Sequence, residues 1–245
     1  MKAVLSADTI VADRSRTPGM FTAIARRYDL LNHMLSFNVD RHWRRMLVTV
    51  ARTRPGERVL DVATGTGDVA IEFARRTRAG EIIGLDPSSG MLEVGREKLA
   101  RLAGMDHVRL VEGDALALPF PDASFDVVTI AFGLRNLPDY GAGIAEMARV
   151  LRPGGRLLVL EFLPPEGAAR LVFRPYIATV LPIVGRVISG SPEAYRYLAS
   201  SIRSFVTAEA TRGMLAGAGL ENVETRRLTG GVAGLHRGAK GSNAC

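Results

Sequence analysis

The sequence predicts one α/β domain built on a doubly wound, mostly parallel sheet, and three observations carry that prediction. Apolar, strand-like runs alternate with amphipathic helical stretches between about residues 58 and 162. These runs are apolar on both faces, as in parallel strands that helices cover from both sides. A glycine loop follows the first run and leads into a helix. A chain of 245 residues is long enough for one such core.

The elements are expected in a regular order. A polar, flexible N-terminal arm (1–19) precedes two helices within residues 20–52, which are separated by a break near Ser36-Phe37-Asn38. The rest, 20–245, is read as a single domain. Strands are predicted at 59–63, 81–85, 108–112, 125–132 and 156–162, with helices at 68–77, 89–102 and 141–151 between them.

The last third of the chain departs from this alternation. Residues 171–188 are apolar with helical spacing, but Arg174, Pro182 and Arg186 interrupt them, so they do not form a membrane span. An inserted apolar cover, about 163–205, is expected there. A helix at 208–217 and two strands at 223–228 and 232–236, joined through Gly230-Gly231, are predicted to close the sheet as an antiparallel edge.

Composition and charge narrow the function classes. The single cysteine, Cys245, excludes an internal disulfide and argues against a cysteine metal site, and no metal is predicted. The net charge of +7 is explained most simply by a solvated basic surface, and nucleic acid or an anionic membrane face are the alternative partners. The arginines are scattered in pairs and are not interleaved with aromatic residues along a stripe, which argues against nucleic acid.

The loop Gly65-Thr66-Gly67 is the first candidate site. A strand, a glycine loop and a helix N-terminus together form a nucleotide-binding device. Asp61 lies inside the strand, four residues before Gly65. A carboxylate there suits a ligand with positive charge and free hydroxyls better than a phosphate. The loop also fits the loose dinucleotide pattern, but the chain has no Tyr-x-x-x-Lys pair for hydride chemistry.

Two more acids end neighbouring predicted strands. Asp86 closes the second strand, where it can accept from both ribose hydroxyls of an adenosine or can cap the next helix. Asp114 closes the third strand and can accept from an adenine amino group, with the backbone N–H of Ala115 donating to a ring nitrogen. Its alternative role is an Asx turn that leaves the strand. Because parallel strands end at one edge, Asp61, Asp86 and Asp114 are expected along one crevice.

The three acids and the loop resemble the class I S-adenosylmethionine-dependent methyltransferases. That resemblance implies a seven-stranded sheet with an antiparallel last strand and helices on both faces. It also implies S-adenosyl-L-methionine as the cofactor. The positive sulfonium group of that cofactor is compatible with carboxylates beside the loop.

Longer runs resemble one family in particular, the ubiquinone/menaquinone biosynthesis C-methyltransferases. The runs span residues 27–32, 114–122, 132–136, 149–155, 160–162, 194–198 and 230–237, so the resemblance covers about residues 20–240. It implies methylation of a polyprenylated quinol ring in menaquinone biosynthesis, in ubiquinone biosynthesis, or in both. It carries cofactor roles onto Thr66, Asp86, Asp114 and Ala115.

The implied reaction needs a group that activates the acceptor ring, and the turn after the fourth predicted strand offers candidates. Arg135 would stabilise a phenolate, and Asn136 would orient the same oxygen. A surface ion pair is the alternative role for Arg135. Tyr28 would contact the ring or relay the proton, and a packed core tyrosine is an equal alternative.

The partners follow from the acceptor. A polyprenyl tail requires a meeting at a membrane, so a cytoplasmic protein, peripheral at the inner face, is expected. Residues 171–188, with Arg170, Arg174 and Arg186, are a candidate membrane face, and a lid or a homo-oligomer surface is an equal alternative. The choice of quinol, the tail length, the general base and the oligomeric state stay open. A methyltransferase acting on another small molecule or on nucleic acid is the alternative function.

Overall fold

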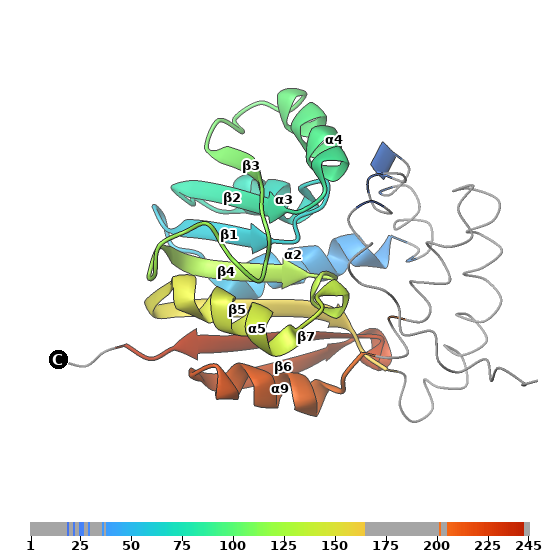
Figure 1. The fold of residues 1–245 in the computed structure, drawn as a ribbon. Coiled ribbons are helices and arrows are strands. Elements are labelled where there is room, and N and C mark those ends of the chain that lie inside the picture. Colours follow the sequence, from blue (N-terminus) through green and yellow to red (C-terminus); the bar gives the residue numbers. More distant parts are fainter. Residues whose placement is uncertain are drawn as a thin grey trace, which may run out of the picture.

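The computed structural model describes residues 38–164 and 205–242, together with Gly19, Thr22, Ala25, Arg26, Asp29, Ser36 and Ser201. Over these residues the chain forms a seven-stranded sheet with helices on both faces (Figure 1). The predicted N-terminal arm and apolar cover lie outside the described residues, apart from single positions. Within the described residues, no helix combines the length and the apolarity needed to cross a bilayer.

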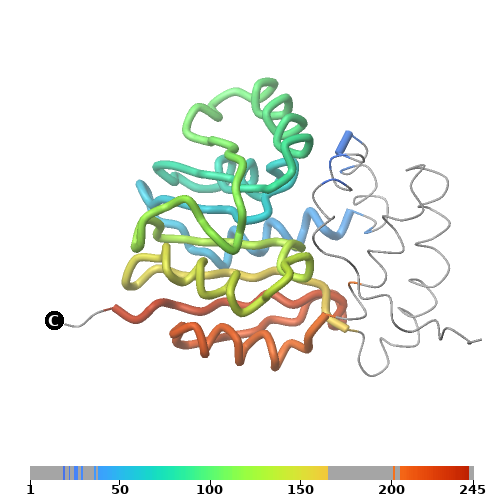
Figure 2. The backbone as a smooth tube through the Cα atoms, in the orientation of Figure 1, coloured from blue at the N-terminus to red at the C-terminus, as the bar shows by residue number. Residues whose placement is uncertain are grey.

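The strands run in the order β3-β2-β1-β4-β5-β7-β6 across the sheet. Their bounds are β1 Arg58–Val62, β2 Glu81–Asp86, β3 Val108–Glu112, β4 Phe125–Ala131, β5 Leu151–Phe162, β6 Leu220–Leu228 and β7 Ala233–Lys240. The first five pair in parallel, and β7 pairs antiparallel with both β5 and β6. Figure 2 shows that neighbours in the sheet are not always neighbours in the sequence: the red C-terminal strands lie beside yellow β5. The predicted sheet and its antiparallel last strand are confirmed.

The helices are α2 Val39–Ala51, α3 Asp68–Arg76, α4 Ser89–Ala100, α5 Tyr140–Val150 and α9 Ala208–Gly217, with short 3-10 turns η2 Leu134–Asn136 and η4 Thr229–Gly231. Helices α2 and α3 bury one apolar layer against the sheet, centred on Trp43, Leu47 and Phe73. Helices α5 and α9 bury the other layer, with Ile144, Met147 and Leu215. Figure 1 shows α5 and α9 in front of the sheet and α2 behind it.

The bounds of several elements differ from the sequence prediction; β6, for example, begins at Leu220 and not at residue 223. Strand β5 begins at Leu151 and not at residue 156, because Leu151 already pairs with Phe125 before the register shifts. Gly154, with φ +76°, takes up that irregularity, so the Pro-Gly-Gly run bends the strand without ending it. Strand β7 continues to Lys240, beyond the predicted end at His236, because it pairs with β5 as far as Ala239.

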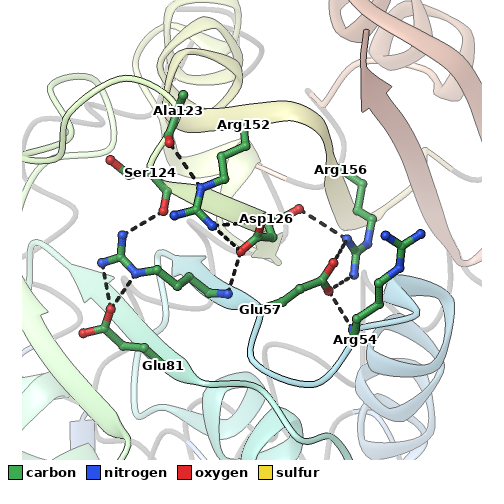
Figure 3. Close-up of polar contacts among 9 residues, drawn as sticks. Arg54, Glu57, Glu81, Ala123, Ser124, Asp126, Arg152 and Arg156 are labelled. Atoms are coloured by element: carbon green, nitrogen blue, oxygen red, sulfur yellow. Dashed lines mark hydrogen bonds and ion pairs between the residues drawn. The ribbon is translucent and has the colours of Figure 1, made fainter. Parts of the chain in front are cut away.

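A network of charged side chains ties the amino ends of the parallel strands together (Figure 3). Asp126 of β4 accepts from the backbone N–H of Arg58 at 2.8 Å and from the guanidinium of Arg152. The buried Arg156 of β5 donates to both carboxylate oxygens of Glu57. This network lies at the end of the sheet opposite to the glycine loop, so it stabilises the frame and takes no part in the candidate site.

Candidate active site

The carboxyl ends of β1 and β4 form the point where the strand order reverses. Open α/β sheets bind ligands in the crevice at this point, because the connections leave in opposite directions. Here α3 follows β1 onto one face of the sheet, and α5 follows β4 onto the other. The arrowheads of β1, β2 and β4 all point the same way in Figure 1, so their carboxyl ends lie at one side of the sheet.

The glycine loop has the geometry that the sequence predicts. Gly65 and Gly67 have φ of +57° and +81°, a left-handed conformation that side chains disfavour, and Gly67 is the N-cap residue of α3. The N–H of Gly65 donates to Asp86 Oδ2 at 2.8 Å. The loop after β1 is therefore fastened to the end of β2.

Asp61 is buried near the end of β1, just before this loop, with 1% of its surface exposed. Its two carboxylate oxygens accept from the hydroxyls of Thr64 at 2.6 Å and Thr129 at 2.8 Å. Burial raises the pKa of Asp61 to about 6, although the two hydroxyls and the nearby Arg44 favour the ionised form. A ligand cation beside this carboxylate would offset the cost of its burial. The buried carboxylate therefore fits a cofactor that carries a sulfonium group.

A small cavity of about 30 Å³ adjoins the loop. Asp61, Gly65 and Thr66 line it from the β1 side, Phe132 from the end of β4, and Arg44 from α2. Ala63 and Phe132 at the two strand ends both have positive φ, +53° and +57°. Strained backbone in non-glycine residues collects at functional sites, and here two examples share one cavity.

The two other predicted acids differ in their surroundings. Asp86 is buried, which raises its pKa, and it accepts from the N–H groups of Gly65 and Ser88. It does not cap α4, because Ser88 is the capping residue and accepts from Met91. Asp114 is exposed and forms the Asx turn, accepting from Leu116 at 2.9 Å. Ala115, next to it, is buried.

The hydroxyl of Thr66 is engaged with protein groups. It donates to Asp29 at 2.6 Å and accepts from Lys98 at 2.9 Å. The ammonium of Lys98 also donates to Asp29 at 2.7 Å and to Asp68 at 2.6 Å. We call Asp29, Thr66, Asp68 and Lys98 the N-terminal clasp, because they join the segment before α2 to the glycine loop.

Arg135 is buried, with 4% exposed, at the first turn after β4. Its Nη1 donates to Glu161 Oε1 at 2.7 Å and to the carbonyl of Phe132. Its Nε has no hydrogen-bond partner within the described residues. The alternative of a surface ion pair is therefore wrong: the pair exists, but both partners are buried. Asn136 lies on the same turn, with Nδ2 at 3.4 Å from the Phe132 carbonyl.

Aromatic rings surround the arginine. Phe132 and Phe162, both partly exposed, have ring centroids 4.8 Å apart, and Trp43 of α2 packs against both. The guanidinium carbon of Arg135 lies 5.5 Å from the Phe162 ring centroid. Gly133 contacts the loop after β1 so closely that a Cβ there would be 2.5 Å from that of Ala63. The acceptor-side turn and the cofactor-side loop are therefore packed together.

The structure groups most of the predicted residues at one edge. Asp61, Gly65, Thr66, Gly67 and Asp86 surround the loop, Arg135 and Asn136 follow the adjacent β4, and Asp114 with Ala115 follows β3 on the other side. Tyr28 lies outside the described residues.

Sequence reasoning did not identify Arg44, Lys98 and Glu161. Glu161 had a detectable signal, since a lone acid in the apolar run 157–162 needs a buried partner. Its partner could not be read from the sequence.

The chain is similar to known proteins over most of its length. Residues 9–240 match the model of the ubiE/COQ5 methyltransferase family. A demethylmenaquinone methyltransferase of Thermus thermophilus is 51% identical over 220 residues, 89% of this chain and 99% of the relative. A relative of the same name from Deinococcus radiodurans is 50% identical over 90% of this chain and 91% of its own length. A ubiquinone/menaquinone biosynthesis C-methyltransferase UbiE of Edwardsiella ictaluri is 44% identical over 90% of this chain and 89% of its own length.

Solved structures that are more distant in sequence share the fold. The [4+2]-cyclase SpnF has a TM-score of 0.69 at 17% identity, covering 94% of this chain and 97% of its own. A S-adenosylmethionine-dependent methyltransferase of Thermotoga maritima has a TM-score of 0.63 at 19% identity, covering 91% and 99%. The fold is that of the class I methyltransferases, and the chain belongs to the ubiE/COQ5 methyltransferase family.

Proposed function

We propose that this protein methylates a ring carbon of demethylmenaquinol to give menaquinol, with S-adenosyl-L-methionine as the methyl donor. Family membership supports the reaction type. Demethylmenaquinol is the favoured acceptor because two relatives of 50–51% identity are named demethylmenaquinone methyltransferase. Relatives of 42–45% identity carry the name that joins ubiquinone and menaquinone, so the ubiquinone-pathway quinol is the second candidate acceptor.

One observation carries the proposal, and it concerns Phe132. This residue lines the cavity at the glycine loop, and its carbonyl accepts from the side chains of both Arg135 and Asn136. Phe132 therefore contacts both groups: it lines the cavity of the candidate cofactor site and binds the side chains of the candidate acceptor site. Methyl transfer requires this adjacency, because donor carbon and acceptor carbon must be held in near-attack contact.

The cofactor side is assigned to residues of three adjacent strands. Asp61 and the loop Gly65-Thr66-Gly67 would hold the charged end, Asp86 the ribose hydroxyls, and Asp114 with Ala115 the adenine. Because the Thr66 hydroxyl is engaged by the clasp, its backbone N–H is the group left for the cofactor. When bound, S-adenosylmethionine supplies an electrophilic methyl group on a sulfonium centre that becomes a neutral thioether.

The acceptor side must make a ring carbon nucleophilic. Loss of a hydroxyl proton places negative charge on the oxygen and on the ring carbon beside it. That carbon forms the new bond to the methyl group and then loses its hydrogen as a proton. Arg135 would donate to the phenolate oxygen through N–H groups that are directed toward it in a dry site. Asn136 would orient the same oxygen, and Tyr28 stays a candidate contact to the ring.

The acceptor's tail bears on where the protein works. A polyprenyl chain partitions into the bilayer, so we place the encounter at the inner membrane surface, with the protein bound peripherally. The proposed membrane face at residues 171–188 lies outside the described residues.

The test is methyl transfer by the purified protein. Methyl-labelled S-adenosylmethionine is incubated with demethylmenaquinol and, in a parallel sample, with its oxidised quinone. We expect label in menaquinol from the reduced acceptor alone, because only the quinol has a hydroxyl to ionise. Absence of label with the quinol, or equal label with the quinone, contradicts the proposal. Label in RNA under the same conditions would favour the nucleic-acid alternative.

A further inference from the structure

Glu161, at the end of β5, has no role in the assignments above. We propose that Glu161 is a positioning residue for the methyl acceptor and fixes the guanidinium of Arg135 so that its Nε edge serves the acceptor oxygen. This inference rests on the proposed function and adds to it a residue that acts through Arg135.

The contacts of Glu161 all lead to the acceptor-side turn. The side chain is fully buried, with 0% exposed. Oε1 accepts from Arg135 Nη1 at 2.7 Å and from the backbone N–H of Phe162 at 2.9 Å, and Oε2 accepts from the backbone N–H of Arg135 at 3.2 Å. One carboxylate therefore holds both the main chain and the side chain of Arg135.

These contacts decide which part of the guanidinium is available. Nη1 has two N–H groups, and Glu161 and the Phe132 carbonyl use both of them. The buried Nε has no partner within the described residues. A buried donor without a partner is costly, so a ligand oxygen at this edge would satisfy it. The contacts with Glu161 and with the Phe132 carbonyl thus fix the orientation of the guanidinium, and with it the direction of the Nε–H group.

The charge of Glu161 has a second consequence. It compensates the guanidinium, so Arg135 meets the acceptor with directed N–H groups and little net charge. Replacing Glu161 by glutamine leaves the positive charge uncompensated, and a nearby positive charge favours ionisation of a phenol. The Glu161→Gln enzyme should therefore ionise its acceptor at lower pH while holding it in a poorer orientation.

A second arginine of β5, paired with a carboxylate far from the site, provides a matched control. Arg156 begins the regular part of β5 and donates to both oxygens of Glu57, and the pair is nearly buried at the opposite end of the sheet (Figure 3). Glu57→Gln removes one paired carboxylate without approaching the candidate site. This variant measures the loss of folding stability that follows from breaking such a pair, separate from any effect on the candidate site.

The experiment compares the wild type with Glu161→Gln, Arg135→Met, the double variant and Glu57→Gln. Cofactor affinity is measured by calorimetric titration, and kcat and KM are measured with demethylmenaquinol across pH. We expect Glu161→Gln to lower kcat at least tenfold and to move the acid limb of the pH profile to lower pH, with cofactor Kd within twofold of the wild type. Glu57→Gln should keep both kcat and the limb.

The double variant gives the decisive comparison, because a residue that acts through Arg135 has no further effect once Arg135 is gone. We expect the double variant to match Arg135→Met in kcat. Additive losses, or equal kcat for Glu161→Gln and Glu57→Gln, overturn the positioning role while the proposed function stands. A wild type that does not methylate the quinol refutes the proposed function itself. If Glu161→Gln prevents folding, Glu161→Met combined with Arg135→Met replaces the pair by apolar side chains, and its kcat is compared with Arg135→Met alone.

Discussion

Among single residues of the site, the buried carboxylate of Asp61 lowers the stability of the folded protein. Asp61 has lost its water and is surrounded by two threonine hydroxyls, with its pKa raised to about 6. Groups whose pKa is strongly perturbed by burial cluster at functional sites. The carboxylate that identifies the loop in the sequence is therefore also the group that destabilises the loop when no cation is bound.

Asp61→Asn tests this directly. The pKa of Asp61 is about 6 in the folded state against an ordinary 3.8, so the folded state binds its proton more tightly. The contribution of this group to stability therefore rises as pH falls from about 6 toward 4, and the full cost is present above pH 6. A shift of this size corresponds to at most about 3 kcal/mol. We expect the Asp61→Asn protein to gain up to this amount at pH 7, and to lose cofactor affinity by about tenfold or more.

Thermal unfolding between pH 4 and 8 and calorimetric titration provide the two measurements. Asp126→Asn is the control, because Asp126 sits in the charged network at the amino ends of the strands. It should lower stability and leave cofactor affinity unchanged. If Asp61→Asn instead lowers stability at pH 7 and binds the cofactor normally, Asp61 is a structural residue.

Some of these residue roles could be predicted from the sequence, and others could not. Asp61, Asp86 and Gly65 could be assigned because their positions relative to the strand ends are local properties of the sequence. The partners of Thr66 and Arg135 lie 37 and 26 residues away, and their contacts exist only after the helices and strands have packed. For that reason the engagement of the Thr66 hydroxyl and the role of Glu161 could not be predicted.

At the scale of elements, the segment before α2 is attached to the cofactor loop by the N-terminal clasp. Lys98 of α4 places its three N–H groups on Asp29, Thr66 and Asp68. Arg44 of α2 adds a weaker pairing with Asp68 at 3.4 Å. Asp29 belongs to the run 27–32, which resembles the family and precedes the α/β unit in the chain. Through Asp29, this run contacts the cofactor loop at Thr66.

Lys98→Met should loosen this attachment. The ammonium makes three charge-assisted bonds, and their loss leaves carboxylates beside the loop without their main counter-ion. We expect a stability loss of about 1.5–3 kcal/mol and a cofactor affinity reduced roughly tenfold. Calorimetric titration and thermal unfolding measure both quantities.

Lys240→Met is the matched control for that substitution. Lys240 also donates to three acceptors, the carbonyls of Ala148, Arg149 and Leu151, but at the far end of the sheet. It should lose comparable stability with cofactor affinity unchanged. Wild-type affinity in both variants would show that the clasp does not serve cofactor binding.

Element boundaries show where local patterns fail. The helix at 208–217 and the strand at 108–112 agree with the sequence prediction, because capping and apolar runs define them. Strand β5 was predicted too short, because Pro153 and Gly154 are strong turn signals in the sequence. Pairing with β4 overrides that local preference.

At the scale of the whole molecule, the order of the strands explains the position of the site. β1 and β4 are neighbours in the sheet although β2 and β3 separate them in sequence, so the cofactor loop and the turn with Arg135 meet at one edge. The parallel sheet could be predicted from alternation alone. The antiparallel edge could be predicted from the two final strands around Gly230-Gly231 and agreed with the resemblance. The complete strand order could not be predicted, since local patterns do not encode long-range pairing.

Whether this protein methylates demethylmenaquinol in the cell is decided by the quinone content of cells that lack the gene. Cells without the protein should accumulate demethylmenaquinone and lack menaquinone. The wild-type gene should restore menaquinone, and a gene encoding Arg135→Met should not. Unchanged menaquinone in the deleted strain would contradict the claim.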